Sequence, residues 1–153
     1  LRDAGKSAHE VVEWIEKRKP NIHAYMTTND LIYLHRGGRL SRASAFFGGA
    51  LGINPILKLD AAGRLVVSEK VRGRRKALNR MYEIVRELVE NPSNQVVYID
   101  HSDCAPEEVR TFADTLIKEN WFKGSYINYI GPTIGAHTGP GLIAVFFTGP
   151  PRV

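Results

Sequence analysis

The segment from Ile130 to Phe147 combines reactive side chains with a high density of glycine and proline. It carries one imidazole, His137, and two hydroxyls, Thr133 and Thr138. Its glycines and prolines are Gly131, Pro132, Gly135, Gly139, Pro140 and Gly141. Glycine allows positive φ and close approach of backbone to a ligand, while proline fixes φ, so this composition is typical of a rigid loop. We expect the loop to present His137 and Thr138, with Thr133 and Gly135, to a small polar group.

The same segment has a plainer interpretation. Glycine and proline are ordinary turn residues, and a single histidine often serves only as a structural hydrogen-bonding group. The segment contains no phosphate-loop or dinucleotide-binding pattern. Those motifs are followed by a helix, whereas this segment is followed by an apolar strand.

Two arginines that stand next to glycines are further candidates for binding an anion. Arg39 follows the double glycine 37–38, which predicts a left-handed helix stop. Arg72 lies between a predicted strand and the start of a predicted helix. An anion bound by Arg72 could also accept hydrogen bonds from the first N–H groups of that helix. Each arginine could instead be a solvated side chain near a helix end. Phe46 and Phe47 are suited to lining an apolar slot, or to ordinary core packing.

The residue types needed for catalysis are present near Asp100 but not in a catalytic pattern. Asp100, His101 and Ser102 are consecutive, and adjacent residues on a strand point to opposite faces, so they do not form a triad by themselves. The chain has no G-x-S-x-G motif. A hydrolase that uses His101 or His137 is therefore the least favoured function, and we predict that the protein is not an enzyme.

Length and composition indicate one ordinary globular domain. The 153 residues can bury a hydrophobic core, and no apolar run approaches the roughly 20 residues that span a bilayer. The single cysteine, Cys104, excludes an internal disulfide and indicates a reducing, cytoplasmic environment. Because Cys104 has no partner thiol and the five histidines are scattered, we expect no metal and no cofactor.

The net charge of +5 is concentrated in one stretch. Six cations lie between Lys70 and Arg80, with no acid among them. Such a patch predicts, as the alternative function, a nucleic-acid or phosphate-binding module. No nucleic-acid reader motif or aromatic stacking pattern accompanies the charge, so we expect no nucleic-acid partner.

Periodicity and turn signals predict the elements that must position these residues. The predicted helices span 8–18, 30–36, a short stretch capped by Ser41, 74–90 and 106–119. The predicted strands span 22–28, 53–59, 64–71, 95–100, 126–130 and 142–147, and Pro55 predicts an edge or a bulge. Short connections favour antiparallel pairing. We therefore expect an α+β fold with a mostly antiparallel or mixed sheet of five to six strands and helices packed on one face.

Three ordered motifs resemble the C-terminal domain of the DegV family. They are G-G-R-L-S at 37–41, I-N-P-I-L-K-L-D-A-A-G-R-L at 53–65 with K-V-R-G-R-R-K-A-L at 70–78, and I-G-P-T-I-G-A-H-T-G-P-G at 130–141. The resemblance covers the chain from about His23 onward. It implies a bacterial two-domain protein that binds a long-chain fatty acid between its domains. Some members present the acid to a fatty acid kinase, which makes an acyl phosphate for phospholipid synthesis.

The resemblance also implies roles for individual residues. It places His137 in the network around the carboxylate and Thr138 in the loop of His137, with Arg39 and Arg72 near the exposed head group, where a kinase would dock. It implies a domain boundary as well: residues 1–20 form a lead-in helix and residues 21–153 the lipid-binding domain. The family's N-terminal domain, which supplies threonine and serine ligands, has no counterpart here. Asn54 stands where the family often has lysine.

The physics of a fatty acid fits this expectation. A tail of about 16 carbons gains about 0.8 kcal/mol for each buried methylene, so the apolar slot dominates the affinity. The carboxylate must be paired, because an isolated buried charge costs several kcal/mol. A histidine, threonine hydroxyls and loop N–H groups can supply that pairing.

Overall fold

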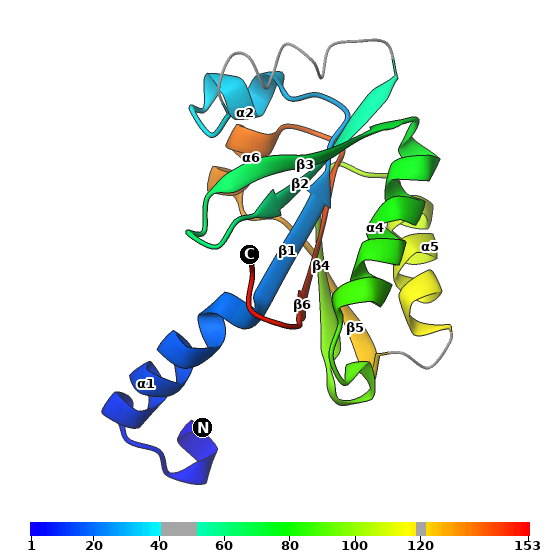
Figure 1. The fold of residues 1–153 in the computed structure, drawn as a ribbon. Coiled ribbons are helices and arrows are strands. Elements are labelled where there is room, and N and C mark those ends of the chain that lie inside the picture. Colours follow the sequence, from blue (N-terminus) through cyan, green and yellow to red (C-terminus); the bar gives the residue numbers. More distant parts are fainter. Residues whose placement is uncertain (41–51, 119–121) are drawn as a thin grey trace.

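Six strands form one mixed sheet in the computed structural model, which describes residues 1–40, 52–118 and 122–153 (Figure 1). The strands are β1 (Ile22–Thr27), β2 (Ile53–Leu59), β3 (Leu65–Arg72), β4 (Val96–Ser102), β5 (Gly124–Tyr129) and β6 (Leu142–Thr148). Their order is β3-β2-β1-β6-β4-β5. All neighbours are antiparallel except β4 and β5, which are parallel. The predicted α+β fold with a mostly antiparallel, mixed sheet is confirmed.

The helices follow the predicted order, with one addition. They are α1 (Ala8–Arg18), α2 (Ile32–Arg36), α4 (Arg74–Leu88), α5 (Pro106–Ile117) and α6 (Pro132–Thr138), with 3-10 turns at Arg2–Ala4, Lys19–Asn21 and Pro92–Asn94. The predicted helix after Ser41 lies outside the described residues. The interpretation of 130–141 as a loop is wrong for its centre, which forms α6. Pro132 occupies the first turn of that helix, where its missing N–H and fixed φ are tolerated.

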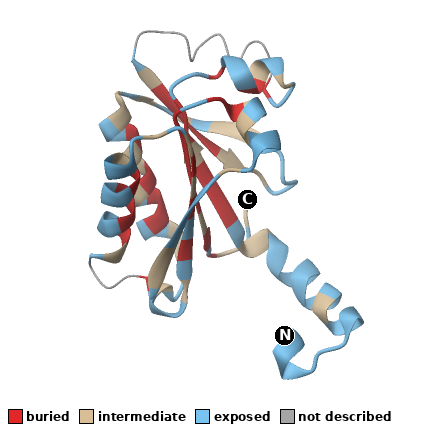
Figure 2. Ribbon diagram, turned by 180° about the vertical axis from the view of Figure 1, so that it is seen from behind, coloured by how far each residue is buried: buried red, intermediate tan, exposed pale blue. Residues whose placement is uncertain are grey.

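Helices α4 and α5 cover one face of the sheet (Figures 1 and 2). The main hydrophobic core lies between these two helices and the sheet. It contains Tyr25, Ile56, Met81, Ile84, Val85, Val97, Ile99, Val109, Phe112, Ala113, Leu116, Phe122, Ile143, Val145 and Phe147. Each amphipathic helix turns its apolar stripe toward the sheet. In α4, Ala77, Met81, Ile84 and Val85 are buried, whereas Leu78 and Tyr82 are only partly buried against this core.

Helix α2 packs on the other face, with α6 beside it, so the expectation that helices cover one face only is wrong. Successive side chains of a strand point to opposite faces, so Met26 and Leu57 point away from the core that contains Tyr25 and Ile56. Met26 and Leu57 pack instead with the apolar residues around α2. This second cluster contains Leu31, Leu34, Leu40 and Leu57, with Met26, Leu65 and Val67 partly buried against it.

Part of that second face carries exposed aromatic side chains. Phe146 is paired with Ala24 of β1 and with Tyr98 of β4, and Tyr98 is paired with Tyr126 of β5. Paired residues share a face, so these four side chains form one row across the sheet. Tyr98 is 52% exposed and Tyr126 is 57% exposed. We call the three aromatic members, Tyr98, Tyr126 and the half-buried Phe146, the aromatic row.

Pro55 pairs with β3 on one side only and lies next to a bulge. Although β2 lies between β3 and β1 in the strand order, Pro55 has a partner in β3 alone, and the register of β2 against β3 shifts between Ile56 and Leu57. The paired part of β1 and β2 starts at Ile56, opposite Thr27. Pro55 therefore lies beyond that ladder, where its missing N–H removes no bond to β1.

Helix α1 extends away from the sheet (Figures 1 and 2). A capping box starts it: the Ser7 hydroxyl accepts a bond from the Glu10 N–H, and the Glu10 carboxylate accepts from the Ser7 N–H. The helix has no buried residue, and its apolar residues Val12, Trp14 and Ile15 are exposed. Capping and helix propensity hold it as a helix, and its apolar stripe faces water.

The buried imidazole of His23 makes stability depend on pH. His23 is 5% exposed, stacks on Phe147 at 5.2 Å between ring centroids, and donates from Nε2 to the Pro150 carbonyl at 2.8 Å. Burial lowers the pKa of His23, because it removes the imidazolium from water. The unfolded chain therefore binds this proton more readily, and stability falls as pH drops below the ordinary histidine value of about 6.5.

We expect the free energy of unfolding to decrease between pH 7.5 and pH 5.5, with a smaller decrease in His23→Phe. Phenylalanine keeps the stack on Phe147 and cannot take up a proton. Denaturant unfolding at several pH values measures both slopes. Equal slopes in wild type and His23→Phe would assign the pH dependence to other groups.

Candidate functional site

The imidazole of His137 packs against the backbone of Gly37, where α6 crosses the end of α2. A β-carbon built on Gly37 would lie 2.3 Å from Nδ1, 3.1 Å from Cγ and 3.3 Å from Cε1 of His137. The Nδ1 edge of the ring therefore faces Gly37, and Nε2 lies on the other side of the ring. His137 is half-buried, so part of this residue is accessible at the surface of the domain.

A second close approach fixes the end of α6. Gly139 caps this helix with φ 72° and ψ −178°, and a β-carbon there would lie 2.3 Å from Cδ2 of Tyr33. Only glycine adopts such angles readily. The two short helices thus touch through Gly37 and Gly139, one glycine from each side.

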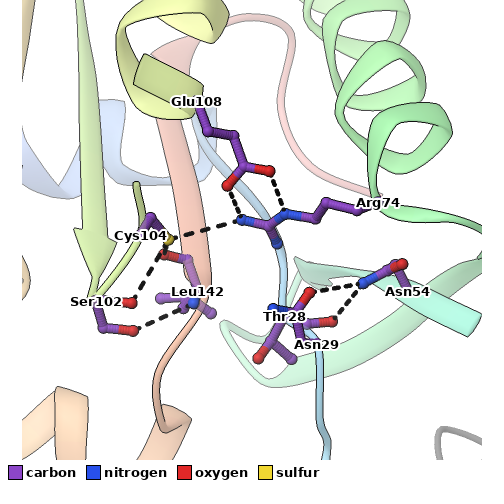
Figure 3. A network of polar contacts seen from close by, with 8 residues as sticks. All are labelled: Thr28, Asn29, Asn54, Arg74, Ser102, Cys104, Glu108 and Leu142. Carbon is purple, nitrogen blue, oxygen red and sulfur yellow. Dashed lines mark hydrogen bonds and ion pairs between the residues drawn. The ribbon is translucent and has the colours of Figure 1, made fainter. Parts of the chain in front are cut away.

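The connection from α6 to β6 is fastened to the end of β4. Ser102 at the end of β4 donates from Oγ to the Gly139 carbonyl and accepts from the Leu142 N–H at 3.2 Å. The Gly141 N–H donates to the Ser102 carbonyl at 2.6 Å. Asn54 donates to the Thr28 carbonyl and to Oδ1 of Asn29, so the end of β1 is tied to the start of β2 (Figure 3). Here Asn54 serves as a structural hydrogen-bond donor.

The other predicted residues of this segment lie around His137 in different environments. Thr138 is buried, and its hydroxyl donates to the Ile134 carbonyl at 3.0 Å. A carboxylate only accepts hydrogen bonds, so a direct bond from Thr138 would require that helix bond to break. Thr133 is exposed in the first turn of α6, and Gly135 is half-buried in its middle.

Arg39 and Arg72 lie at the surface in two different places: Arg39 follows α2, and Arg72 ends β3. Arg39 is exposed, and its Nη1 donates to the Gly37 carbonyl at 2.6 Å, which brings the guanidinium close to the helix end that supports His137. Arg72 is exposed at the end of β3, opposite Ile53. Phe46 and Phe47 lie outside the described residues.

The basic stretch 70–80 is partly neutralised by acids from other parts of the chain. Arg80 contacts carboxylates of Glu69, Glu83 and Glu87 at 2.9–3.2 Å. These carboxylates, with Glu69 first, raise the pKa of Arg80. Arg74 pairs with Glu108 through two bonds of 2.9 and 3.0 Å. Only Glu108 is distant in the chain from its partner, whereas Glu69, Glu83 and Glu87 lie within 11 residues of Arg80.

A polar network joins the first turns of α4 and α5 to the sheet (Figure 3). Nη2 of Arg74 lies 3.6 Å from Sγ of Cys104, and that thiol donates to the Leu142 carbonyl at 3.1 Å. Burial raises the pKa of Cys104, so the thiol stays protonated near neutral pH and is a poor nucleophile. This network therefore fastens α4 and α5 to the strand that follows α6.

The residues around Asp100 lie as their alternation predicts. His101 is buried toward the core, with its ring 4.4 Å from the Tyr129 ring, whereas Asp100 points to the opposite face. Nδ1 of His101 has no hydrogen-bond partner among the described residues. The Ser102 hydroxyl is engaged with Gly139, so these consecutive residues form no nucleophile and base pair.

The sequence analysis missed Gly37, Tyr33 and Ser102 as members of the site. The first glycine of the G-G-R motif was interpreted as part of a helix stop, yet Gly37 has φ −75° and only Gly38, at φ 71°, is left-handed. This difference is invisible in a sequence. The sequence signal for the contact itself is the high density of glycine in both segments, because helices that cross closely need small residues.

Gly135 offers a direct check on the helical state of 132–138. A β-carbon there would meet only Cγ2 of Ile130, at an ordinary 3.6 Å. Alanine favours a helix interior over glycine by roughly 0.5–1 kcal/mol. We therefore expect Gly135→Ala to raise the free energy of unfolding by up to about 1 kcal/mol, measured by urea denaturation. A clear loss of stability would contradict the helical geometry of this segment.

Within residues 1–40, 52–118 and 122–153, no helix is both long enough and apolar enough to cross a membrane. The same residues contain no group of three or more histidine, cysteine or acidic side chains arranged to hold a metal ion.

The fold and the site define an α+β domain in which two short helices meet through glycines and present an imidazole beside an apolar cluster. A family model described as "uncharacterised protein, DegV family" matches residues 1–149. A DegV domain-containing protein of Clostridium perfringens is 38% identical over 149 residues, which are 97% of this chain and 51% of that protein. The chain belongs to the DegV family, and it spans about half the length of these relatives.

Solved structures of the family have the same fold. A fatty acid binding DegV family protein of Streptococcus agalactiae is 33% identical, with a TM-score of 0.80, over 97% of this chain and 52% of that one. DegV of Bacillus subtilis, described as a fatty acid binding protein, is 30% identical, with a TM-score of 0.75, over 97% and 52%. A DegV family protein of Ruminococcus gnavus, described with vaccenic acid, is 29% identical, with a TM-score of 0.82, over 95% and 51%.

Proposed function

We propose that this protein binds a long-chain fatty acid and holds its carboxylate at the His137 segment. The observation that carries the proposal is the half-buried His137 ring, fixed against Gly37 at the edge of an apolar cluster in a family whose solved members include fatty acid binding proteins. Nε2 of His137 would donate to a carboxylate oxygen. A hydrogen bond to a charged group is worth about 1.5–3 kcal/mol, which compensates part of the cost of burying the charge.

The acyl chain would lie along the second face of the sheet. The apolar cluster around α2, with Leu34, Leu57 and the half-buried Met26, begins next to α6. Phe46 and Phe47 remain proposed members of this slot. Burying methylenes against such side chains provides most of the binding free energy, so we expect affinity to rise with chain length until the slot is filled.

The proposal includes a second protein that performs chemistry on the bound acid. Arg39 and Arg72 are exposed, Arg39 contacts the Gly37 carbonyl beside His137, and Arg72 lies opposite Ile53 at the end of β3. A fatty acid kinase would dock against these arginines in the bacterial cytoplasm and phosphorylate the carboxylate to an acyl phosphate. On this proposal the protein is a carrier rather than an enzyme.

The fatty acid would be enclosed by a further domain. The family relatives are about twice as long as this chain. The aromatic row and the apolar side of α1 leave apolar surface exposed, as expected for surface that packs against another domain. We propose that the complementary half of a full-length DegV protein covers this surface and adds hydroxyl ligands to the carboxylate.

Lipid extraction tests the proposal. The purified protein, in the longest form that its gene encodes, is extracted with organic solvent, and the extract is analysed by mass spectrometry. We expect a long-chain fatty acid in near-stoichiometric amount. A folded protein that carries no acyl chain, and that takes none up from added oleate or palmitate, would contradict the proposed function.

The alternative of a nucleic-acid or phosphate-binding module receives less support. Arg74 and Arg80, two of the six cations of the basic stretch, are held in ion pairs with acids. Binding to short DNA or RNA with a steep salt dependence, and unchanged in His137→Ala, would favour this alternative.

A further inference from the structure

We propose that Gly37 is a positioning residue for the fatty-acid head group: because Gly37 has no side chain, the His137 ring can pack directly on its backbone, and this contact fixes the orientation of the ring. This inference rests on the proposed function and assigns a role to a residue that would itself touch no ligand.

The conformation of Gly37 does not explain why this position is glycine. Its φ of −75° and ψ of −2° belong to the right-handed helical region, which any residue adopts. Gly38 has the left-handed φ of 71° that ends α2, and a β-carbon there would meet nothing within 4 Å. The two adjacent glycines therefore serve different purposes, and the purpose of Gly37 must lie in its surroundings.

The surroundings of Gly37 are filled by the His137 ring. A β-carbon at Gly37 would lie 2.3 Å from Nδ1, far inside the 3.0 Å below which real β-carbon contacts essentially never occur. Any side chain at position 37 must therefore displace the ring. The contact also excludes a ligand from the Nδ1 edge and leaves Nε2 as the nitrogen that can bind a carboxylate.

The backbone on both sides of the contact is held, so the ring is the part that would move. On the α2 side, the Gly37 N–H donates to the Tyr33 carbonyl at 2.8 Å, and Leu34 is buried in the second apolar cluster. On the α6 side, Ser102 bonds the Gly139 carbonyl, and the Tyr33 ring covers Gly139. An added methyl group would turn the imidazole about its side-chain torsions rather than separate the two helices.

A double-mutant cycle with two ligands tests this role. Affinities for a long-chain fatty acid and for the alcohol of the same chain length are measured by titration calorimetry. In Gly37→Ala we expect the fatty acid to bind at least about tenfold more weakly, and the alcohol to bind nearly as before, because only the acid depends on the orientation of His137. In the His137→Ala background, Gly37→Ala should add little, because the ring it displaces is absent.

Gly131→Ala is the matched control. Gly131 precedes α6 with φ −59°, and a β-carbon there would meet nothing within 4 Å. We expect this variant to bind acid and alcohol as wild type does. Equal losses for acid and alcohol in Gly37→Ala, or an undiminished effect of Gly37→Ala when His137 is already alanine, would overturn the positioning role.

A ligand-free measurement separates this inference from the proposed function. If the wild-type protein binds neither acid nor alcohol, the proposed function fails. The contact between Gly37 and the His137 ring is then tested through the Hε1 and Cε1 NMR resonances of His137. We expect these resonances to move in Gly37→Ala and to stay in place in Gly131→Ala. Unchanged His137 resonances in a folded Gly37→Ala protein would overturn the inference.

Discussion

Replacement of His137 by alanine is expected to weaken the binding of a long-chain fatty acid by about 10- to 100-fold or more and to leave the fold intact. The variant removes a donor to a charged group, a loss of about 1.5–3 kcal/mol, and about 1.4 kcal/mol corresponds to a factor of ten in affinity. The apolar contacts with the tail remain. Titration calorimetry with a fatty acid measures the change, and circular dichroism checks the fold.

Two comparisons make this result specific. The alcohol of the same chain length should lose much less affinity in His137→Ala, because it carries no charge that needs a partner. His9→Ala, on the exposed surface of α1, should bind the acid as wild type does. A His137→Ala protein with wild-type affinity for the acid would exclude His137 from the head-group site.

Replacement of Gly139 by alanine is expected to cost roughly 2–6 kcal/mol of the free energy of unfolding. Two effects add. The backbone angles of φ 72° and ψ −178° are strained for any residue with a β-carbon, at about 1–3 kcal/mol. The new β-carbon would also lie 2.3–2.8 Å from three atoms of the Tyr33 ring, and such overpacking costs about 1–3 kcal/mol. Urea denaturation of both proteins measures the loss.

The two causes can be separated in a second background. Tyr33→Ala removes the ring, so Gly139→Ala in that background should cost less but should still destabilise, because the backbone strain remains. Gly131→Ala lies at the other end of α6 without a steric conflict and should be nearly neutral. A Gly139→Ala protein as stable as wild type would contradict the described crossing of α2 and α6.

Most of the framework was predictable, because local signals and tertiary packing agree there. The capping box at Ser7 and Glu10 starts α1 where the sequence predicts, and the apolar stripe of α5 buries Val109, Phe112 and Leu116. The failure at 132–138 is instructive. Glycine and proline make this segment a poor helix on its own, and its helical state depends on contacts with α2 and on the bond from Ser102, which are long-range contacts.

Of the candidate site, only the reactive side chain, His137, could be predicted from the sequence. His137 stands out by its residue type and its surroundings, whereas its contact with Gly37 joins positions 100 apart, and no local pattern encodes it. The interpretation of the basic stretch as one patch failed to foresee the pairs of Arg74 with Glu108 and of Arg80 with Glu69, for the same reason. A charge pattern along the chain does not show which acids the fold brings alongside.

The most direct test of the account is a crystal structure of the protein grown with a long-chain fatty acid. We predict that a carboxylate oxygen lies within about 2.7–3.0 Å of Nε2 of His137, on the side of the ring opposite Gly37, with the acyl chain against the apolar cluster of α2. An acyl chain bound at full occupancy with its carboxylate away from His137 would contradict the account.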